Sequence, residues 1–543
     1  MSYRYSFSSY RSPVLGRKGA VGSSQPLATA AGIEILSKGG TAADAAVAVA
    51  AALNVTEPGS TGLGGDAFAL YYDAGEHKVF SLNGSGRAPK ALTLERVRKE
   101  GFETELPPQH PYCITVPGAC AMWCDLTKRF GRLPLSETLA PAIHLADEGF
   151  PVAPLTALAW QNAAKHWLSK ALNGSELTIG GRGPAAGEIF RNPALARTLR
   201  MITEGGKKAY YEGEIAESIV SIIREAGGCM ELDDLATHQS TWVEPISIEY
   251  RGVRVWECPP NGQGLAALLA LNILEGFDIA NLPANSTQRL HLTIEAMRLA
   301  FADAFHYIAD PDFSPAPLQD LLSRSYADDR RRWINPNAAN LSYPYGSPIP
   351  SSDTVYLSVA DQYGNACSFI NSNYMGFGTG IVPRGRGFSL QNRGHNFSLQ
   401  EGHANQLMPG KRPYHTIIPA MATYSADDSL YASYGVMGGF MQPQGHLQVT
   451  VAMLDDELDP QAALDRPRFC LQGQRSGGKV ALEEGIPFEV LSELAAMGHP
   501  VIPVSGTART VFGRGQIIRR DPENGVLWAG SDPRADGCAM TLV

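Results

Sequence analysis

The sequence has no run of apolar residues near the roughly 20 that a bilayer-spanning helix requires, which argues against an integral membrane protein. Residues 1–26 hold scattered arginines but no continuous apolar segment, so we expect no signal peptide and a cytoplasmic location. A basic stripe is also missing, and the formal charge of −9 over 543 residues argues against nucleic-acid binding.

Clustered metal ligands are missing as well. The eight cysteines are dispersed, and although Cys120 and Cys124 have helical spacing, no group of histidines stands beside them to complete a metal site. We therefore expect reduced, mostly buried thiols and neither a metal nor a cofactor. The HExxH, GxSxG and Walker A signatures are absent too, which argues against zinc proteases, hydrolases with a nucleophile elbow and P-loop enzymes.

What the sequence does contain is a large apolar fraction, 44%, beside 18% charged residues, which is typical of a globular protein with a large core. Hydrophobic patterns predict helices over residues 27–37, 42–53, 265–274, 287–309 and 444–453. They predict strands over residues 67–72, 249–257, 355–360, 366–370, 420–425 and 430–437. This order suits two sheets flanked by helices on both outer faces. The segment 42–53 is so rich in alanine that we expect it to be buried.

A glycine-rich loop lies between the second predicted helix and the first predicted strand. Gly62, Gly64 and Ala67 match the GxGxxA dinucleotide-binding fingerprint. That fingerprint needs a strand before the loop and a helix after it, and here the order is reversed. We therefore interpret the loop as a tight glycine turn near the active centre.

The stretch around Thr354 is the candidate catalytic segment. Small polar residues run into this single threonine, and a predicted β-hairpin follows it. A threonine hydroxyl is a weak nucleophile unless a base lies beside it, and the nearest base is its own α-amino group. That amine exists only if the peptide bond between Asp353 and Thr354 is cut. The alternative is an ordinary hairpin in which the threonine serves only strand propensity.

Six motifs along the chain resemble those of the γ-glutamyltransferase family of N-terminal-nucleophile (Ntn) hydrolases, in the same order and at similar spacing over nearly the whole sequence. They are Gly62-Leu63-Gly64-Gly65, Ala88-Pro89, Asp353-Thr354, Gly376-Phe377-Gly378-Thr379-Gly380, Pro409-Gly410-Lys411-Arg412-Pro413 and Gly438-Gly439. The resemblance implies an α+β fold, a four-layer αββα sandwich. It also implies a precursor that cuts itself before Thr354 into a large subunit, 1–353, and a small subunit, 354–543. The two subunits would stay interleaved in one globular unit, which could form a homodimer.

The same resemblance assigns the catalytic groups. Thr354 matches the family nucleophile, and Ser372 matches a threonine whose hydroxyl contacts the nucleophile's amine. Gly438 and Gly439 match the pair whose backbone N–H groups form the oxyanion hole, a role that suits adjacent glycines because they let a backbone approach a reacting carbonyl closely. The alternative for the two glycines is a strand-to-helix turn.

Six further positions match the family's substrate pocket or lie beside it but differ in residue type. They are Arg87, Tyr374, Arg393, Asn396, His415 and Thr416. Arg393 and Asn396 replace a glutamine and an aspartate that hold a substrate's α-amino group, a change that disfavours an ammonium and favours an anion. Arg87 and Arg393 could instead be ordinary ion-pair residues.

These departures resemble the branch of the family that holds oxamate amidohydrolase and the cephalosporin-type acylases. The predicted function is therefore a self-processing amidohydrolase that cleaves a small carboxylate-bearing amide, oxamate-like or an acyl amide, through a Thr354 acyl-enzyme. One alternative is a γ-glutamyl hydrolase or transpeptidase that acts on glutathione-type substrates. Another is a non-catalytic descendant that serves as a binding or scaffold protein.

Overall fold

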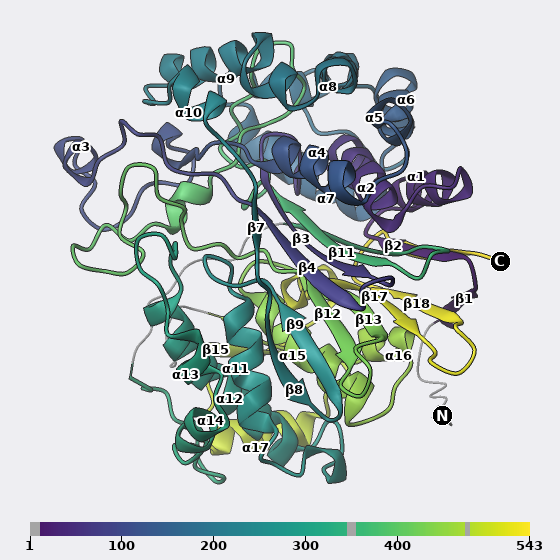
Figure 1. Cartoon of the computed structure of the whole chain (residues 1–543). Helices are drawn as coiled ribbons and strands as arrows, with labels where there is room; N and C mark the ends of the chain where they lie inside the picture. Colours follow the sequence, from purple (N-terminus) through teal and green to yellow (C-terminus); the bar gives the residue numbers. More distant parts are fainter. Residues whose placement is uncertain (1–10, 345–353, 473–477) are drawn as a thin grey trace.

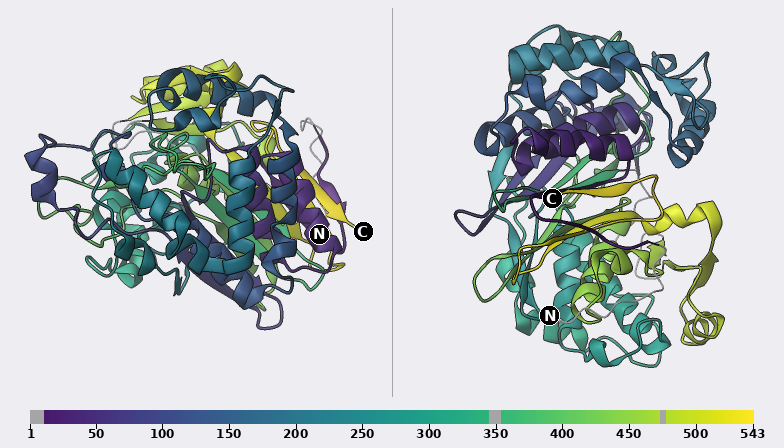
Figure 2. Two further views of the ribbon diagram at one scale, coloured as in Figure 1. Left: turned by 90° about the horizontal axis from the view of Figure 1, so that it is seen from above. Right: turned by 90° about the vertical axis from the view of Figure 1, so that its right-hand side faces the viewer.

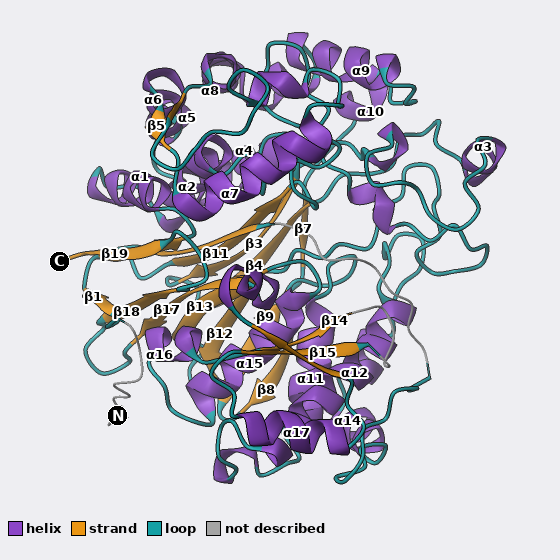
Figure 3. Cartoon of the chain, turned by 180° about the vertical axis from the view of Figure 1, so that it is seen from behind, coloured by secondary structure: helices purple, strands orange, loops and turns teal. Residues whose placement is uncertain are grey.

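Two seven-stranded sheets lie face to face, and helices cover the outer face of each (Figure 1). This computed structural model describes residues 11–344, 354–472 and 478–543. The view from behind shows the same order of layers: helices, sheet, sheet, helices (Figure 3). The four-layer αββα architecture predicted from the sequence is confirmed.

The first sheet holds the candidate catalytic strand at its centre. Its strands, in spatial order, are β19 (Cys538–Leu542), β2 (Gly19–Ser23), β10 (Val355–Ala360), β11 (Ala366–Ser372), β3 (Asp66–Asp73), β4 (Lys78–Gly84) and β7 (Thr241–Val243). Every pairing in it is antiparallel. Strands from before and after Thr354 alternate in this sheet, because β10 and β11 lie between β2 and β3.

The alanine-rich helix α2 (Ala42–Thr56) covers β10 and β11 on the outer side of this sheet. Each of its residues is buried, as predicted from the alanine content, because short side chains allow close packing on every face. A capping box between Thr41 and Asp44 starts the helix. The backbone N–H of Ala42 also donates to Asp361 Oδ2 at 2.8 Å, which ties the start of α2 to the turn between β10 and β11.

The second sheet carries the glycine pair at one strand end. Its strands, in spatial order, are β1 (Val14–Gly16), β18 (Leu527–Ser531), β17 (Arg514–Arg520), β13 (Leu430–Met437), β12 (Ala420–Tyr424), β9 (Val253–Glu257) and β8 (Ile246–Tyr250). The single strand predicted over residues 249–257 is wrong. The chain turns at Arg251 and Gly252, both at positive φ (50° and 83°), and forms the β8–β9 hairpin. The apolar alternation continues on both sides of this turn and so concealed it.

Helices on the two outer faces come from different parts of the sequence, as the side view shows (Figure 2). The helices beside the first sheet, besides α2, are α1 (Pro26–Ser37), α4 (Ala119–Phe130), α5 (Leu135–Thr138), α6 (Ala140–Glu148), α7 (Pro154–Ala163), α8 (Pro193–Tyr211), α9 (Glu214–Glu225) and α10 (Leu232–Ala236). Those beside the second sheet are α11 (Gly264–Leu274), α12 (Thr287–Tyr307), α13 (Leu318–Leu321), α14 (Arg324–Arg331), α15 (Met441–Leu454), α16 (Pro460–Asp465) and α17 (Phe488–Ala496).

Smaller elements complete the fold. A three-stranded sheet contains β14 (Phe469–Gln472), β15 (Lys479–Glu483) and β16 (Val501–Val504), and β5 (Phe150–Pro151) pairs with β6 (Ile189–Phe190). Helix α3 (Leu94–Lys99) lies in a loop region at one side (Figure 1). No helix in the described ranges is long and apolar enough to cross a membrane.

The contact between the two sheets fixes how β10 lies against β13. Ser358 Oγ donates to the backbone oxygen of Ser433 at 3.0 Å. Two residues earlier in β10 and two later in β13, the Tyr356 ring packs on Gly435, where an added Cβ would lie 2.6 Å from the ring. The two strands therefore run in opposite directions across the interface. Continuing both by two residues brings Thr354 opposite the end of β13, where Gly438 follows.

Candidate active site

Thr354 is buried directly before β10, and its hydroxyl contacts that of Ser372 at the end of β11. The two Oγ atoms are 3.1 Å apart, which follows from the antiparallel register that pairs Val355 with Asn371. The structure thus brings together the predicted nucleophile and its predicted partner. Their contact is between the two hydroxyls. Asp353, on the other side of the predicted cleavage bond, lies outside the described residues.

Two N–H donors hold the Ser372 hydroxyl in position. The backbone N–H of Tyr374 donates to Ser372 Oγ at 2.8 Å, and Arg393 Nη2 donates to it at 3.3 Å. Tyr374 has a positive φ of 76°, an uncommon conformation for a bulky residue. That conformation turns the chain directly after β11, so that the strand end and the following loop face the same hydroxyl.

Arg393 is a completely buried cation in the short helix η5 (Arg393–Asn396). Its Nη1 donates to Thr416 Oγ1 at 2.6 Å, and the guanidinium lies 4.4 Å from the centre of the Tyr374 ring. Burial lowers the pKa of Arg393 to about 10, while Asp66 and Tyr374 act in the opposite direction, so the side chain is charged at neutral pH. No carboxylate lies within 4 Å of it in the described part of the chain.

Asp66, which the sequence analysis did not single out, lies beside this cluster. It is the first residue of β3 and pairs in register with Ser372. Its Oδ2 lies 2.8 Å from His415 Nε2. Its Oδ1 accepts hydrogen bonds from Gly86 N, Gly118 N and Gln391 Nε2. The available sequence signal was an acidic residue directly after a glycine pair and before an apolar strand.

His415 is a neutral imidazole at physiological pH. Burial and the nearby Arg393 guanidinium lower its pKa to about 3, although the hydrogen bond to Asp66 opposes the shift. Because Asp66 already accepts hydrogen bonds from three N–H groups, the His415 proton lies on Nε2 and donates to Asp66 Oδ2. His415 Nδ1 therefore carries a lone pair, and it has no hydrogen-bond partner among the described residues.

The glycine pair Gly438-Gly439 follows β13 and leads into α15. Both glycines have positive φ, 130° and 59°, and their carbonyl oxygens accept from the first turn of α15. Within the described ranges, neither glycine N–H has an acceptor. The pair is thus a strand-to-helix turn that also presents two unpaired donors, so the two interpretations from the sequence are compatible. Their use as an oxyanion hole stays a prediction.

Gln263 connects the glycine pair to the Arg393 cluster. Its side-chain nitrogen donates to the backbone oxygens of Thr416 at 2.5 Å and Gly439 at 2.8 Å. Thr416 also accepts from Arg393, through its side-chain Oγ1. Hydrogen bonds therefore link a series of neighbouring residues from Thr354 to the glycine turn, in the order Thr354, Ser372, Arg393, Thr416, Gln263 and Gly439.

The glycine-rich loop predicted near the active centre packs against the end of β11 and the backbone at Ser389. A Cβ on Gly65 would overlap the backbone oxygen of Ser372, and one on Gly64 would overlap that of Ser389. Neither glycine has positive φ, so their role is close approach. Replacing either with alanine would push the loop away from the end of β11.

Two predicted pocket residues remain, Asn396 and Arg87, and only Asn396 lies beside Arg393. Asn396 lies with Arg393 in η5, where its Nδ2 donates to the backbone oxygen of Tyr414 at 3.1 Å and its Oδ1 has no partner among the described residues. Arg87 is 35% exposed, and its guanidinium forms ion pairs with Asp310 at 3.1 Å and Asp312 at 2.9 Å. The structure therefore does not bring the Arg87 guanidinium into the hydrogen-bonded cluster around Thr354.

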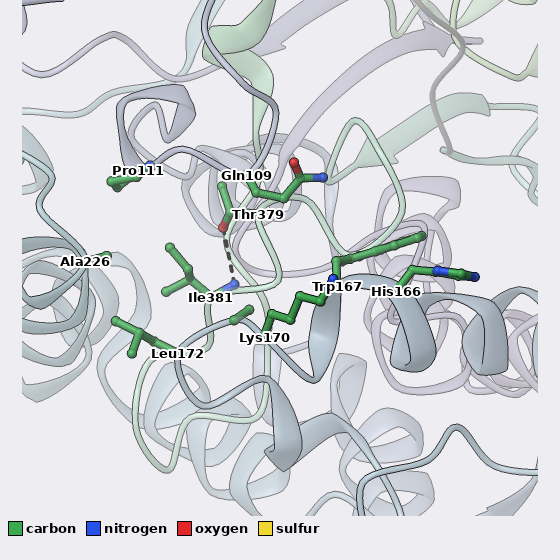
Figure 4. Close-up of a pocket in the computed structure, with 10 residues that line it drawn as sticks. Gln109, Pro111, His166, Trp167, Lys170, Leu172, Ala226, Thr379 and Ile381 are labelled. Atoms are coloured by element: carbon green, nitrogen blue, oxygen red, sulfur yellow. Dashed lines mark hydrogen bonds between the residues drawn. The ribbon is translucent and has the colours of Figure 1, made fainter. Parts of the chain in front are cut away.

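A cavity of about 700 Å³ opens beside the loop that carries Tyr374 (Figure 4). It is lined by Gln109, Pro111, His166, Trp167, Lys170, Ala171, Leu172, Ala226, Thr379 and Ile381. Trp167 Nε1 donates to the backbone oxygen of Gly376 at 3.0 Å. One wall of the cavity therefore belongs to the loop that follows β11.

His291, Glu295 and His499 are the described residues with a spacing that could hold a metal ion. His291 Nε2 lies 2.7 Å from the backbone oxygen of Asn335, and its Nδ1 lies 2.8 Å from His499 Nε2. A direct hydrogen bond between the imidazoles explains this contact. A metal on His499 Nε2 would place the proton on its Nδ1, which is buried without a partner in the described ranges.

Known proteins resemble this chain over nearly its whole length. The family model for gamma-glutamyltranspeptidase matches residues 28–542. The chain is 37% identical over 538 residues to the glutathione hydrolase-like YwrD proenzyme of Bacillus subtilis strain 168, covering 97% of this chain and 99% of that protein. It is 33% identical over 523 residues to the oxamate amidohydrolase proenzyme of Klebsiella pneumoniae, covering 94% and 96%. The crystal structure of cephalosporin acylase from Bacillus halodurans superimposes with a TM-score of 0.91 at 46% identity, covering 100% and 99%. The chain therefore belongs to the γ-glutamyltranspeptidase family, as an amide hydrolase or acyltransferase of the Ntn-hydrolase fold.

Proposed function

We propose that this protein cuts itself between Asp353 and Thr354 and then uses Thr354 to hydrolyse a small amide that carries a carboxylate. The buried hydroxyl pair of Thr354 and Ser372 supports the nucleophile, because these are the side chains that the family resemblance assigns to catalysis. Relatives that are proenzymes support the self-cleavage. The products, 1–353 and 354–543, would stay together because β10 and β11 lie between strands of the larger piece.

The proposed reaction needs only groups of this chain. Thr354 Oγ attacks the substrate carbonyl while its proton passes to the free α-amino group, and the resulting oxyanion accepts from the N–H groups of Gly438 and Gly439. The ammonium then returns the proton to the leaving nitrogen as the C–N bond breaks, which leaves an ester on Thr354. Water attacks this ester with the amine again as base, and the acid departs. One oxyanion donor is typically worth about 3–4 kcal/mol.

The positive charge of Arg393 is the main argument for a substrate with a carboxylate. The guanidinium bonds to the hydroxyls of Ser372 and Thr416, and Asp66 acts on it only from beyond 4 Å. Its charge is therefore incompletely compensated, and burying a charge is costly unless an opposite charge accompanies it. A substrate carboxylate would supply that charge. Asn396 beside it is neutral, so it supplies no negative charge that would hold an ammonium.

The two alternatives are less well supported. A γ-glutamyl group would bring its ammonium into a region where Arg393 is already buried without a carboxylate within 4 Å in the described ranges. A non-catalytic descendant would have no need of Thr354, Ser372 and the paired glycines.

Two measurements test the proposal. Denaturing gel electrophoresis of the purified protein should show two bands of about 353 and 190 residues, since 543 − 353 = 190. Hydrolysis of oxamate, succinamate and glutaramate, compared with γ-glutamyl anilide and neutral propionamide, should then favour an anionic amide. A single full-length band after long incubation would refute the self-cleavage. Equal rates for neutral and anionic amides would refute the assignment of the substrate.

A further inference from the structure

We infer that His415 Nδ1 accepts a hydrogen bond from the substrate, so that the preferred acyl group carries a neutral O–H or N–H donor next to its carboxylate. This inference rests on the proposed function and narrows its substrate class. The simplest members of that class are monoamides of 2-hydroxy dicarboxylic acids.

Four polar atoms around Arg393 have no hydrogen-bond partner among the described residues. They are Tyr374 OH, Arg393 Nε, Asn396 Oδ1 and His415 Nδ1. Their side chains are at most 2% exposed. Buried polar groups are nearly always hydrogen-bonded in folded proteins, so four such atoms in one cluster indicate a ligand that satisfies them.

These side chains are neighbours in space. The Arg393 guanidinium lies over the Tyr374 ring, and Asn396 belongs to the same short helix as Arg393. Thr416, which accepts from Arg393, directly follows His415 in sequence. The cluster also reaches the catalytic pair, because Arg393 donates to Ser372.

The hydrogen-bonding roles of three of the four atoms are fixed, two by the other contacts of the side chain and one by its chemistry. His415 Nε2 donates to Asp66, which leaves Nδ1 as an acceptor, and Asn396 Nδ2 donates to Tyr414, which leaves Oδ1 as an acceptor. Arg393 Nε can only donate. The cluster thus offers one cationic donor and two neutral acceptors, which match an anion and an adjacent group that donates.

A neutral donor fits these acceptors better than an ammonium. Burial and the positive charges of Arg393 and Arg412 disfavour a protonated His415, and they outweigh the opposing effect of Asp66. An ammonium bound at His415 Nδ1 would meet the same repulsion and the same loss of hydration. A hydroxyl or an amide N–H avoids both.

The test compares matched substrates on the processed wild-type enzyme. Succinamate is paired with the 4-amide of 2-hydroxysuccinate, and glutaramate with the 5-amide of 2-hydroxyglutarate. At the chain length that the enzyme prefers, we expect kcat/KM to be about three- to tenfold higher for the hydroxylated member, the range for one neutral hydrogen bond. Equal values within both pairs would overturn the inference. The unsubstituted amides report separately on the proposed function, which fails if they are no better than propionamide.

His415→Gln assigns the preference to the imidazole. The glutamine nitrogen occupies the place of Nε2 and can still donate to Asp66, whereas no atom replaces Nδ1. The ratio between hydroxylated and plain substrate should therefore fall toward one. A ratio that stays at its wild-type value in a fully processed variant would overturn the inference. If the variant does not process, competitive inhibition of the wild type by 2-hydroxyglutarate and glutarate gives the same comparison, and equal inhibition constants would count against the role of His415.

Discussion

Replacing Arg393 with glutamine tests whether substrate recognition can be separated from catalysis. The guanidinium has no carboxylate within 4 Å in the described part of the chain, so a bound substrate carboxylate would be its ionic partner. Losing a hydrogen bond to a charged group costs about 1.5–3 kcal/mol, or about 10–150-fold in rate. Arg393→Gln should lower kcat/KM by that factor for an anionic monoamide such as succinamate.

A neutral amide that lacks only the carboxylate of succinamate provides the internal control. Propionamide has no carboxylate for Arg393, so its slow hydrolysis should change much less, apart from the loss of the 3.3 Å contact to Ser372. Arg393→Lys is the matched variant: it keeps the charge but loses the planar fork that reaches Ser372 and Thr416 together, and it should retain part of the preference for the anion. Both variants must first be shown to process.

The free energy of unfolding of Arg393→Gln provides a second, independent test. Removing a buried, poorly compensated charge relieves a desolvation cost, which offsets the lost bond to Thr416. The free energy of unfolding of Arg393→Gln should therefore fall by no more than about 1 kcal/mol in denaturant titration. A parallel loss of activity toward anionic and neutral amides, or a drop in stability of several kcal/mol, would refute the reasoning and make Arg393 a structural residue.

Further predictions concern the nucleophile, the base and a distant ion cluster. Thr354→Ala should stay uncut and inactive on a denaturing gel and in amide assays, whereas Thr354→Ser should process slowly; efficient cutting of the alanine variant would place the nucleophile elsewhere. Activity should rise through roughly pH 6–8 as the α-amino group loses its proton, and His415 does not explain this rise because burial lowers its pKa to about 3; a pH-independent rate over this range would contradict an amine base. Asp532→Asn should cost about 3–5 kcal/mol of unfolding free energy, because it leaves the buried Arg468 and Arg534 short of a partner. Burial alone would raise the pKa of Asp532, but the two guanidiniums hold that pKa below its usual value. The stability that the Asp532 carboxylate contributes should therefore be present above about pH 4 and be lost as the pH falls further. An unchanged midpoint of acid unfolding in the variant would contradict this.

Much of the architecture could be predicted because it depends on local patterns. The alanine content of α2 predicted its complete burial, and the hairpin after Thr354 predicted that β10 and β11 are neighbours in the sheet. The meeting of Thr354 with Ser372 then follows from antiparallel pairing. These contacts join residues that lie close in sequence or within one regular element.

The rest of the site depends on contacts that no local pattern encodes. Asp66 meets His415 across 349 positions, and Gln263 reaches Gly439 across 176. Arg87 could be assigned to the pocket by its place in a motif, but its ion pairs with Asp310 and Asp312 are set by a loop more than 220 residues away. Charge and residue type alone therefore did not predict which arginine joins the cluster around Thr354.

The packing of Tyr356 on Gly435 has a consequence for how such a site can change over time. The thickness of one aromatic ring, seated where only glycine leaves room, acts as a spacer between the two sheets. It sets the separation between the threonine at the start of one strand and the glycines after the other from within the sandwich. Side chains in the loops at the rim can then change, to suit different acyl groups, without altering that spacing. Substrate preference can therefore evolve while the arrangement proposed for the reaction stays the same.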